Sequence, residues 1–188
     1  ALVPSISSSK AIGNMETVKN RISFSLLVSI LIGMPCMIAM IIFAKPILEL
    51  LFPNATSGAF IYQISCLSII FIVIEQIISG ALHGLGKVLA PAMALSVGVV
   101  IKFILNLYLI PIDTKDFFLG GTAGAAISTV ICHMIAVIIE LKILNKNIDL
   151  KLDKKKFVFK PMLASIIMSV FAYTFYLVMI TRINDKIV

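Results

Sequence analysis

Charged residues are scarce in this sequence. Only 13% of its 188 residues are Asp, Glu, Lys or Arg, whereas 60% are hydrophobic and the mean hydropathy is +1.10. A water-soluble domain carries roughly 25% charged residues. The shortage excludes a water-soluble globule. We predict an all-α integral membrane protein, because helices satisfy their own backbone hydrogen bonds in lipid.

The basic residues do not form a nucleic-acid-binding pattern, although the net charge is +7. The lysines gather in short segments between apolar runs, as the topology of a membrane protein requires. We therefore expect no nucleic-acid partner, and a multi-pass location in the plasma membrane.

Cysteine and histidine are too few for a metal or disulfide framework. The three cysteines lie inside apolar runs, where buried small side chains are the simpler interpretation. His133 has no second histidine or carboxylate three or four residues away, as a helical metal site needs. No nucleophile–base pair, phosphate loop or pair of catalytic carboxylates is present in the sequence. We expect no metal, no cofactor and no enzymatic activity.

Five apolar runs are long enough to cross a membrane as helices. The first would be about 33 Å long at 1.5 Å per residue, and the hydrocarbon core is about 30 Å thick. The predicted spans are residues 22–43, 60–82, 89–110, 123–144 and 158–180.

Polar segments divide these spans. Residues 44–53 mix Lys and Glu with apolar residues and are expected to form an interfacial cap. The predicted organisation is a cytoplasmic loop or interfacial helix at 1–21, a four-helix membrane lobe at 22–144, a basic cytoplasmic loop at 145–157, an additional membrane helix at 158–180 and an outer tail at 181–188.

Lysine and arginine are unevenly divided between the two sides of the membrane. Segments 1–21, 83–88 and 142–160 hold eleven of the sixteen, the alternate segments hold four, and Lys102 lies within a span. Because basic residues stay on the cytoplasmic side, the first set of segments is predicted to be cytoplasmic. The odd number of spans then places the two chain ends on opposite sides.

Polar residues interrupt the two middle spans, with Glu75 and Gln76 in one and Lys102 and Asn106 in the other. An unpaired charge in hydrocarbon costs about 3 kcal/mol. We identify these four residues and His133 as candidates for a substrate or ion pathway. A water-filled cavity is the favoured explanation for Glu75 and Lys102, and hydrogen bonding to neighbouring helices for Gln76.

Depth along the helices predicts which of these groups meet. Counted from the outer span ends at 1.5 Å per residue, Lys102 lies about 12 Å deep, His133 about 15 Å and Glu75 about 22 Å. Asn106 lies one turn from Lys102 on the same face. We expect a polar layer of Lys102, Asn106 and His133. Glu75 should have a partner elsewhere, because no cation of these spans shares its depth.

A short polar turn joins the second and third spans and contains His83, Gly84, Gly86 and Lys87. We expect the two spans to fold back on each other as a hairpin around which the chain is organised. A glycine four residues before Gly84 gives the spacing of close helix packing, although turn geometry explains glycines here equally well.

Several segments, in their order and spacing, resemble one transporter family. Together they resemble the polysaccharide biosynthesis exporters, or stage V sporulation protein B family, which is similar to the lipid II flippases of the multidrug/oligosaccharidyl-lipid/polysaccharide transporter superfamily. The segments are Leu2-Val3-Pro4-Ser5-Ile6-Ser7, AKPILELLFP at 44–53, LHGLGK at 82–87 with Pro91, Lys102 with Asn106, and GTAGAA at 121–126.

The resemblance implies a complete protein of about fourteen helices in two lobes that work by alternating access. This chain would be a fragment of the second lobe, with the first lobe and the last helix as missing partners. The lack of an initiator methionine and of a signal peptide agrees with a fragment. The implied substrate is a lipid-linked oligosaccharide or a peptidoglycan precursor, as used in cell-wall or spore-envelope synthesis.

Other functions stay open from the sequence. A cation-coupled multidrug exporter belongs to the same superfamily, and a non-transporting membrane scaffold for envelope assembly would share the spans. A membrane enzyme of lipid or glycan synthesis would need carboxylates or histidines clustered at one membrane face, which the sequence lacks.

The distribution of basic residues predicts which loops a membrane-impermeant thiol reagent reaches in intact cells. In a background without the native cysteines, cysteines placed at Lys87 and Lys154 should resist the reagent, whereas a cysteine at Lys115 should react. Labelling before and after lysis measures both. The reverse pattern would show that the orientation is inverted.

Overall fold

The computed structural model describes residues 2–112, 120–148, 150, 157 and 159–187. These residues contain helices and turns, and no strand is found among them. Within these described ranges, five helices are long and apolar enough to cross a membrane. The predicted all-α membrane fold with five membrane helices is therefore confirmed, and the protein is a multi-pass membrane protein.

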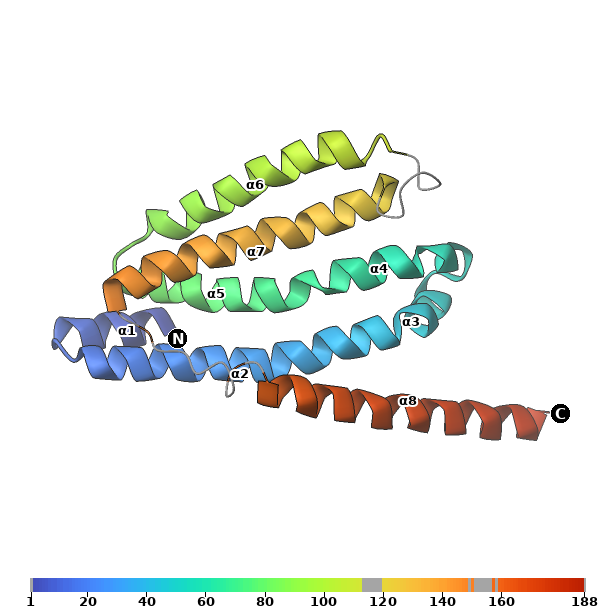
Figure 1. Cartoon of the computed structure of the whole chain (residues 1–188). Coiled ribbons are helices and arrows are strands. Elements are labelled where there is room, and N and C mark those ends of the chain that lie inside the picture. The colour runs from blue at the N-terminus through green and yellow to red at the C-terminus, as the bar shows by residue number, and fades with distance from the viewer. Residues whose placement is uncertain (1, 113–119, 149, 151–156, 158, 188) are drawn as a thin grey trace.

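The helical elements of the described residues are labelled in Figure 1. In chain order they are α1 (Leu2–Ala11), α2 (Met15–Ile42), α3 (Ala44–Leu51), the 3₁₀ helix η1 (Pro53–Gly58), α4 (Ala59–Cys66), α5 (Ser68–Gly84), α6 (Leu89–Leu109), α7 (Gly121–Ile148) and α8 (Lys160–Ile187).

Most helices extend beyond the spans predicted from hydropathy. α2 begins where the side chain of Asn14 accepts a hydrogen bond from the backbone N–H of Thr17 at 3.0 Å, so residues 1–21 form α1 and the first turns of α2. α8 continues to Ile187, through most of the expected outer tail. Hydropathy marks the part of a helix that suits lipid, whereas caps and backbone bonds determine where the helix itself begins and ends.

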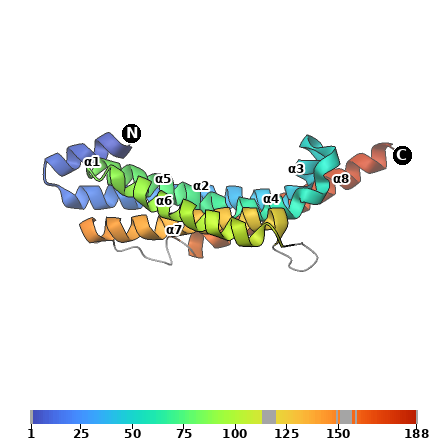
Figure 2. The same ribbon diagram turned by 90° about the horizontal axis from the view of Figure 1, so that it is seen from above.

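The membrane helices form a single row. In Figure 1, α6, α7, the α4–α5 pair and α2 lie side by side in that order, with α8 beside α2 at the edge. The view from above in Figure 2 shows that the row is one thin layer. α1 and α3 are displaced from this layer, near opposite ends of the long helices. Along the direction of the helix axes, the C-terminus and α1 lie at opposite ends of the layer (Figure 1), as an odd number of spans requires.

The expectation that the second and third spans pack against each other is wrong. α5 and α6 are joined by a short turn, but α7 lies between them and contacts both (Figure 1). α7 begins with small residues, and its Ala123, Gly124 and Ala126 are buried. Small side chains let helix backbones approach closely in lipid, which favours α7 as the central helix.

The predicted turn itself is present between α5 and α6. Gly86 has φ +80°, a left-handed conformation that favours glycine. A side chain at Gly84 would place its Cβ 2.8 Å from the Cβ of Ile6 on α1. The Nζ of Lys10 donates a hydrogen bond to the carbonyl oxygen of Leu85 at 2.6 Å. The two glycines therefore have different structural roles, since Gly86 shapes the turn and Gly84 lets α1 pack on α5.

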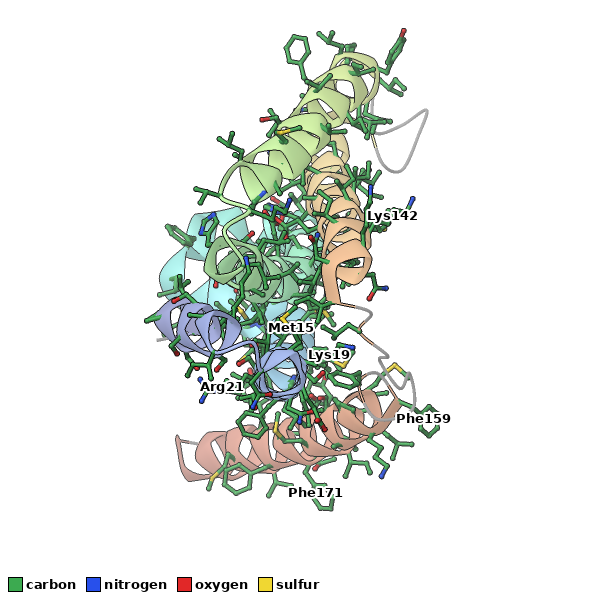
Figure 3. All side chains as sticks on the ribbon, turned by 90° about the vertical axis from the view of Figure 1, so that its left-hand side faces the viewer. Met15, Lys19, Arg21, Lys142, Phe159 and Phe171 are labelled. Atoms are coloured by element: carbon green, nitrogen blue, oxygen red, sulfur yellow. The ribbon has the colours of Figure 1, made fainter. Side chains whose placement is uncertain are left out.

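The largest apolar core lies where α1 packs against the ends of its neighbouring helices. Ile6, Ile22, Ile78, Leu82 and Leu144 from α1, α2, α5 and α7 are fully buried there. By contrast, the outer faces of α6 and α8 expose large apolar side chains, and Phe159 and Phe171 point away from the bundle in Figure 3. In a membrane these faces contact lipid or further helices.

Parts of the predicted loops fall outside the described residues. These parts are 113–119, which contains Lys115, and most of the basic loop at 145–157, which contains Lys154.

A close approach of α6 to α7 predicts a position in the row that is sensitive to substitution. A Cβ at Gly98 on α6 would lie 2.6 Å from the backbone oxygen of Cys132 on α7, whereas a Cβ at Gly80 would meet nothing nearer than 3.7 Å. Gly98→Ala should therefore destabilise the protein by about 1–3 kcal/mol through overpacking. Gly80→Ala is the matched control and should have little effect.

Unfolding of the reconstituted protein by denaturing detergent measures the difference. Equal stability of the Gly98→Ala and Gly80→Ala proteins would contradict the α6–α7 contact.

Candidate functional site

An ionisable pair joins α5 to α7 inside the membrane row. The Nδ1 atom of His133 lies 2.7 Å from the Oε2 atom of Glu75, a hydrogen bond in which the imidazole N–H donates and the carboxylate accepts. The side chains are 22% and 12% exposed, respectively. When His133 is protonated the contact becomes an ion pair, which compensates the charge of Glu75.

This pair shows that the expectation of no cation at the depth of Glu75 is wrong, because His133 lies beside it. The predicted layer of Lys102, Asn106 and His133 stays a prediction. Counting residues from the outer span ends gives comparable depths only where those ends are level. In Figure 1, α4 instead extends beyond the outer end of α7, so equal counts from the two ends do not reach equal depths.

A second polar contact joins the same two helices. The hydroxyl of Ser79 donates a hydrogen bond to Oε1 of Glu140 at 2.7 Å. Ser79 follows Glu75 by four residues and therefore lies on the same face of α5, one turn nearer the predicted cytoplasmic end. Glu140 is fully buried, and its Oε2 atom has no hydrogen-bond partner in the described part of the chain.

Glu140 was not among the residues singled out from the sequence. It follows His133 by seven residues, which places both on one face of α7. That spacing was the available signal.

A third contact joins α6 to α7 nearer the predicted outer side. The hydroxyl of Ser128 contacts Oδ1 of Asn106. Asn106 is thus held by α7, as expected, but by Ser128 rather than by His133. Ser128 and Glu140 are twelve residues apart, about 18 Å along α7, so the three contacts extend through more than half of a core about 30 Å thick.

The other predicted site residues take no part in these three contacts. Lys102 is half-buried on α6, and no salt bridge to it occurs within the described residues. Gln76, His83 and Lys87 are exposed. No group of three His, Cys, Asp or Glu side chains that could hold a metal ion is found in the part of the chain that the structure describes.

The Glu75–His133 contact predicts a measurable coupling energy. His133→Leu leaves the Glu75 carboxylate without its partner, and Glu75→Gln removes the charge that His133 compensates. The double substitution should be less destabilising than the sum of the single ones by about 1–2 kcal/mol. Detergent unfolding of the four proteins gives the double-mutant cycle, and additive effects would exclude the pair.

Comparison with known proteins identifies the family. The family model MatE matches residues 1–108. The uncharacterized membrane protein YabM of Bacillus subtilis (strain 168) is 29% identical over 165 residues, which cover 88% of this chain and 29% of that protein. No solved structure matched the chain. Since the family model covers more than half of the sequence, the chain belongs to the MatE family of membrane transporters.

Proposed function

We propose that this chain is part of the second lobe of a transporter that moves a lipid-linked oligosaccharide or peptidoglycan precursor across the plasma membrane by alternating access. Membership of the MatE family supports transport as the activity. The chain spans 29% of the length of its Bacillus relative, which supports a longer protein with a first lobe and a further helix.

The main structural support for a transport activity is the set of ionisable groups within the row. Glu75, His133 and Glu140 face the α5–α7 interface rather than lipid. Ionisable groups placed in this way mark substrate or ion pathways in membrane proteins. A membrane scaffold has no need of them, because apolar packing holds helices together in lipid without the cost of burying charge.

An apolar cavity supports a lipid-linked substrate. It is an open groove between α2, α3 and α8 at the predicted outer end, with a volume of about 670 Å³. Its lining includes Met40, Phe43, Leu50 and Tyr176, with Glu49 as its charged residue. The rings of Phe43 and Tyr176 meet edge to face, with centroids 5.5 Å apart. Such walls accept an acyl or isoprenoid chain rather than a free sugar.

Lys102 supports an anionic head group on that lipid. Its amine is half-buried in the apolar α6, one turn from Asn106. A phosphate would supply the negative charge that the described residues do not place beside it. Lys102, Asn106 and Gln76 are our proposed contacts along the substrate pathway.

A cation-coupled multidrug exporter is the second candidate. It is favoured by the Glu75–His133 pair, because a coupling ion needs titratable or anionic groups within the membrane. The two candidates differ in the substrate and not in the architecture of the lobe.

Transport by the full-length protein in liposomes tests the proposal. A fluorescent lipid-linked oligosaccharide should cross the bilayer, and Lys102→Ala should abolish its movement while expression and folding stay near normal. Lys45→Ala, on the exposed surface of α3, is the matched control and should transport normally.

Three outcomes would contradict the proposal. Movement of cationic drugs alone would favour the exporter, and a folded protein that moves neither substrate would favour the scaffold. Transport by the 188-residue chain on its own would refute its role as part of one lobe, because alternating access needs two bundles around a shared site.

A further inference from the structure

A second open groove lies between α1 and α2 at the predicted cytoplasmic end of the protein. It is lined by Leu2 and Ser5 from α1 and by Arg21, Phe24 and Ser25 from α2, and its volume is about 410 Å³. α1 is displaced from the layer of membrane helices (Figure 2). Since Arg21 and Phe24 are exposed, this α1–α2 groove faces the surroundings of the protein rather than the interior of the row.

The guanidinium of Arg21 is held in the α1–α2 groove by a contact with α1. Its Nη1 atom donates a hydrogen bond to the carbonyl oxygen of Ser5 at 2.9 Å and also contacts the Ser5 hydroxyl. Among the described residues no carboxylate lies within 4.0 Å of Arg21, and its Nη2 and Nε atoms donate no hydrogen bond. A positioned guanidinium with unused donors suits a phosphate group, which it can bind through two parallel hydrogen bonds.

Ser25 adds a second unused donor on the same face of α2. It follows Arg21 by four residues, which is about 6 Å along the helix. Its hydroxyl is half-buried and has no hydrogen-bond partner in the part of the chain that the structure describes. A hydroxyl at this position can donate to a phosphate or ester oxygen.

The lining of the groove changes from polar to apolar with depth in the membrane. Arg21 comes directly before the predicted span 22–43 and therefore lies at the cytoplasmic boundary of the hydrocarbon core. Phe24 lies about 4.5 Å deeper along α2. Because α1 runs antiparallel to α2 (Figure 1), Leu2 likewise lies deeper than Ser5. A phospholipid has the same order of groups, with its phosphate at the boundary and its acyl chains deeper, whereas a soluble anion has no use for the apolar wall.

The charge around the groove favours an anionic ligand. In the described parts of the predicted cytoplasmic segments, 1–21, 83–88 and 142–148, Glu16 is the single acidic residue. The basic residues of the same parts are Lys10, Lys19, Arg21, Lys87, Lys142 and Lys146. Basic residues near the cytoplasmic leaflet attract its anionic lipids by about 1 kcal/mol each. This general attraction concentrates such lipids at the end of the protein where the groove opens.

We propose that the α1–α2 groove binds one anionic phospholipid of the cytoplasmic leaflet. Its phosphate accepts hydrogen bonds from Arg21 and Ser25, and an acyl chain packs against Phe24 and Leu2. The bound lipid bridges α1 and α2 at the membrane boundary. The groove involves neither α6 nor α7, so the site is distinct from the proposed substrate pathway at Lys102 and Asn106.

Native mass spectrometry of the full-length protein in detergent tests the site with added phosphatidylglycerol and phosphatidylcholine. Both lipids carry a phosphate, but the choline cation cancels its charge, so phosphatidylglycerol should bind more tightly. Arg21→Ala should weaken the binding of phosphatidylglycerol by about tenfold or more, as expected for the loss of a charge-assisted hydrogen bond. Lys142→Ala is the matched control, because it removes the same charge at the same end but on the opposite side of the bundle (Figure 3), and it should bind normally.

Three results of this titration would overturn the site. Equal weakening in Arg21→Ala and Lys142→Ala would show only a general attraction of the surface for anionic lipids. Equal binding of the two lipids by the wild-type protein would exclude selection for an anion. Displacement of the lipid by soluble glycerol phosphate at similar concentrations would show that the groove binds a soluble anion and that its apolar wall contributes nothing.

A second variant separates lipid binding from the packing of α1. Arg21→Ala also removes the contact with Ser5, so it can disturb folding. Ser25→Leu keeps that contact and the net charge, but its larger side chain fills the groove and should weaken the binding of phosphatidylglycerol to a similar extent. Unchanged binding in a folded Ser25→Leu protein would contradict the site. Neither measurement uses transport, so a protein that binds the lipid but moves no substrate would refute the proposed function and keep this site.

Discussion

Polar groups in the hydrocarbon core must find their partners within the protein, and in this chain the position of α7 decides the partners of Glu75, Asn106 and Ser79. α7 lies between α5 and α6, so each interhelical polar contact of the membrane core described above has one member on it. If α5 and α6 packed directly together, Glu75 and Glu140 would be separated from the groups they now contact. The order of helices in the row thus fixes the chemistry of its interior.

Hydropathy and charge were sufficient to predict the class of fold. The five long apolar runs correspond to the five candidate membrane helices, because lipid selects for length and apolarity in a way that one sequence displays directly. The helix ends were less predictable. The start of α2 depends on a cap at Asn14, which lies in a polar segment that hydropathy assigns to a loop.

The partners of the buried polar groups were the least predictable feature. Counting residues gives the depth of Glu75 or His133 within its own helix, but not the relative height of two helices. That height depends on tertiary packing, such as the extension of α4 beyond α7. The buried Glu140 illustrates the same difficulty, since its burial depends on α5 covering a position close to the end of an apolar run.

The two neighbours of α7 differ in how they are attached to it. At Gly98 the backbone of α6 approaches Cys132 so closely that no side chain fits between them. The α5 side is joined by carboxyl, imidazole and hydroxyl groups, whose bonds change with protonation. Steric interlocking resists sliding at every pH, whereas hydrogen bonds between titratable groups do not. We therefore expect α6 and α7 to move as one rigid body in any motion within the row, with sliding confined to the contact between α5 and α7.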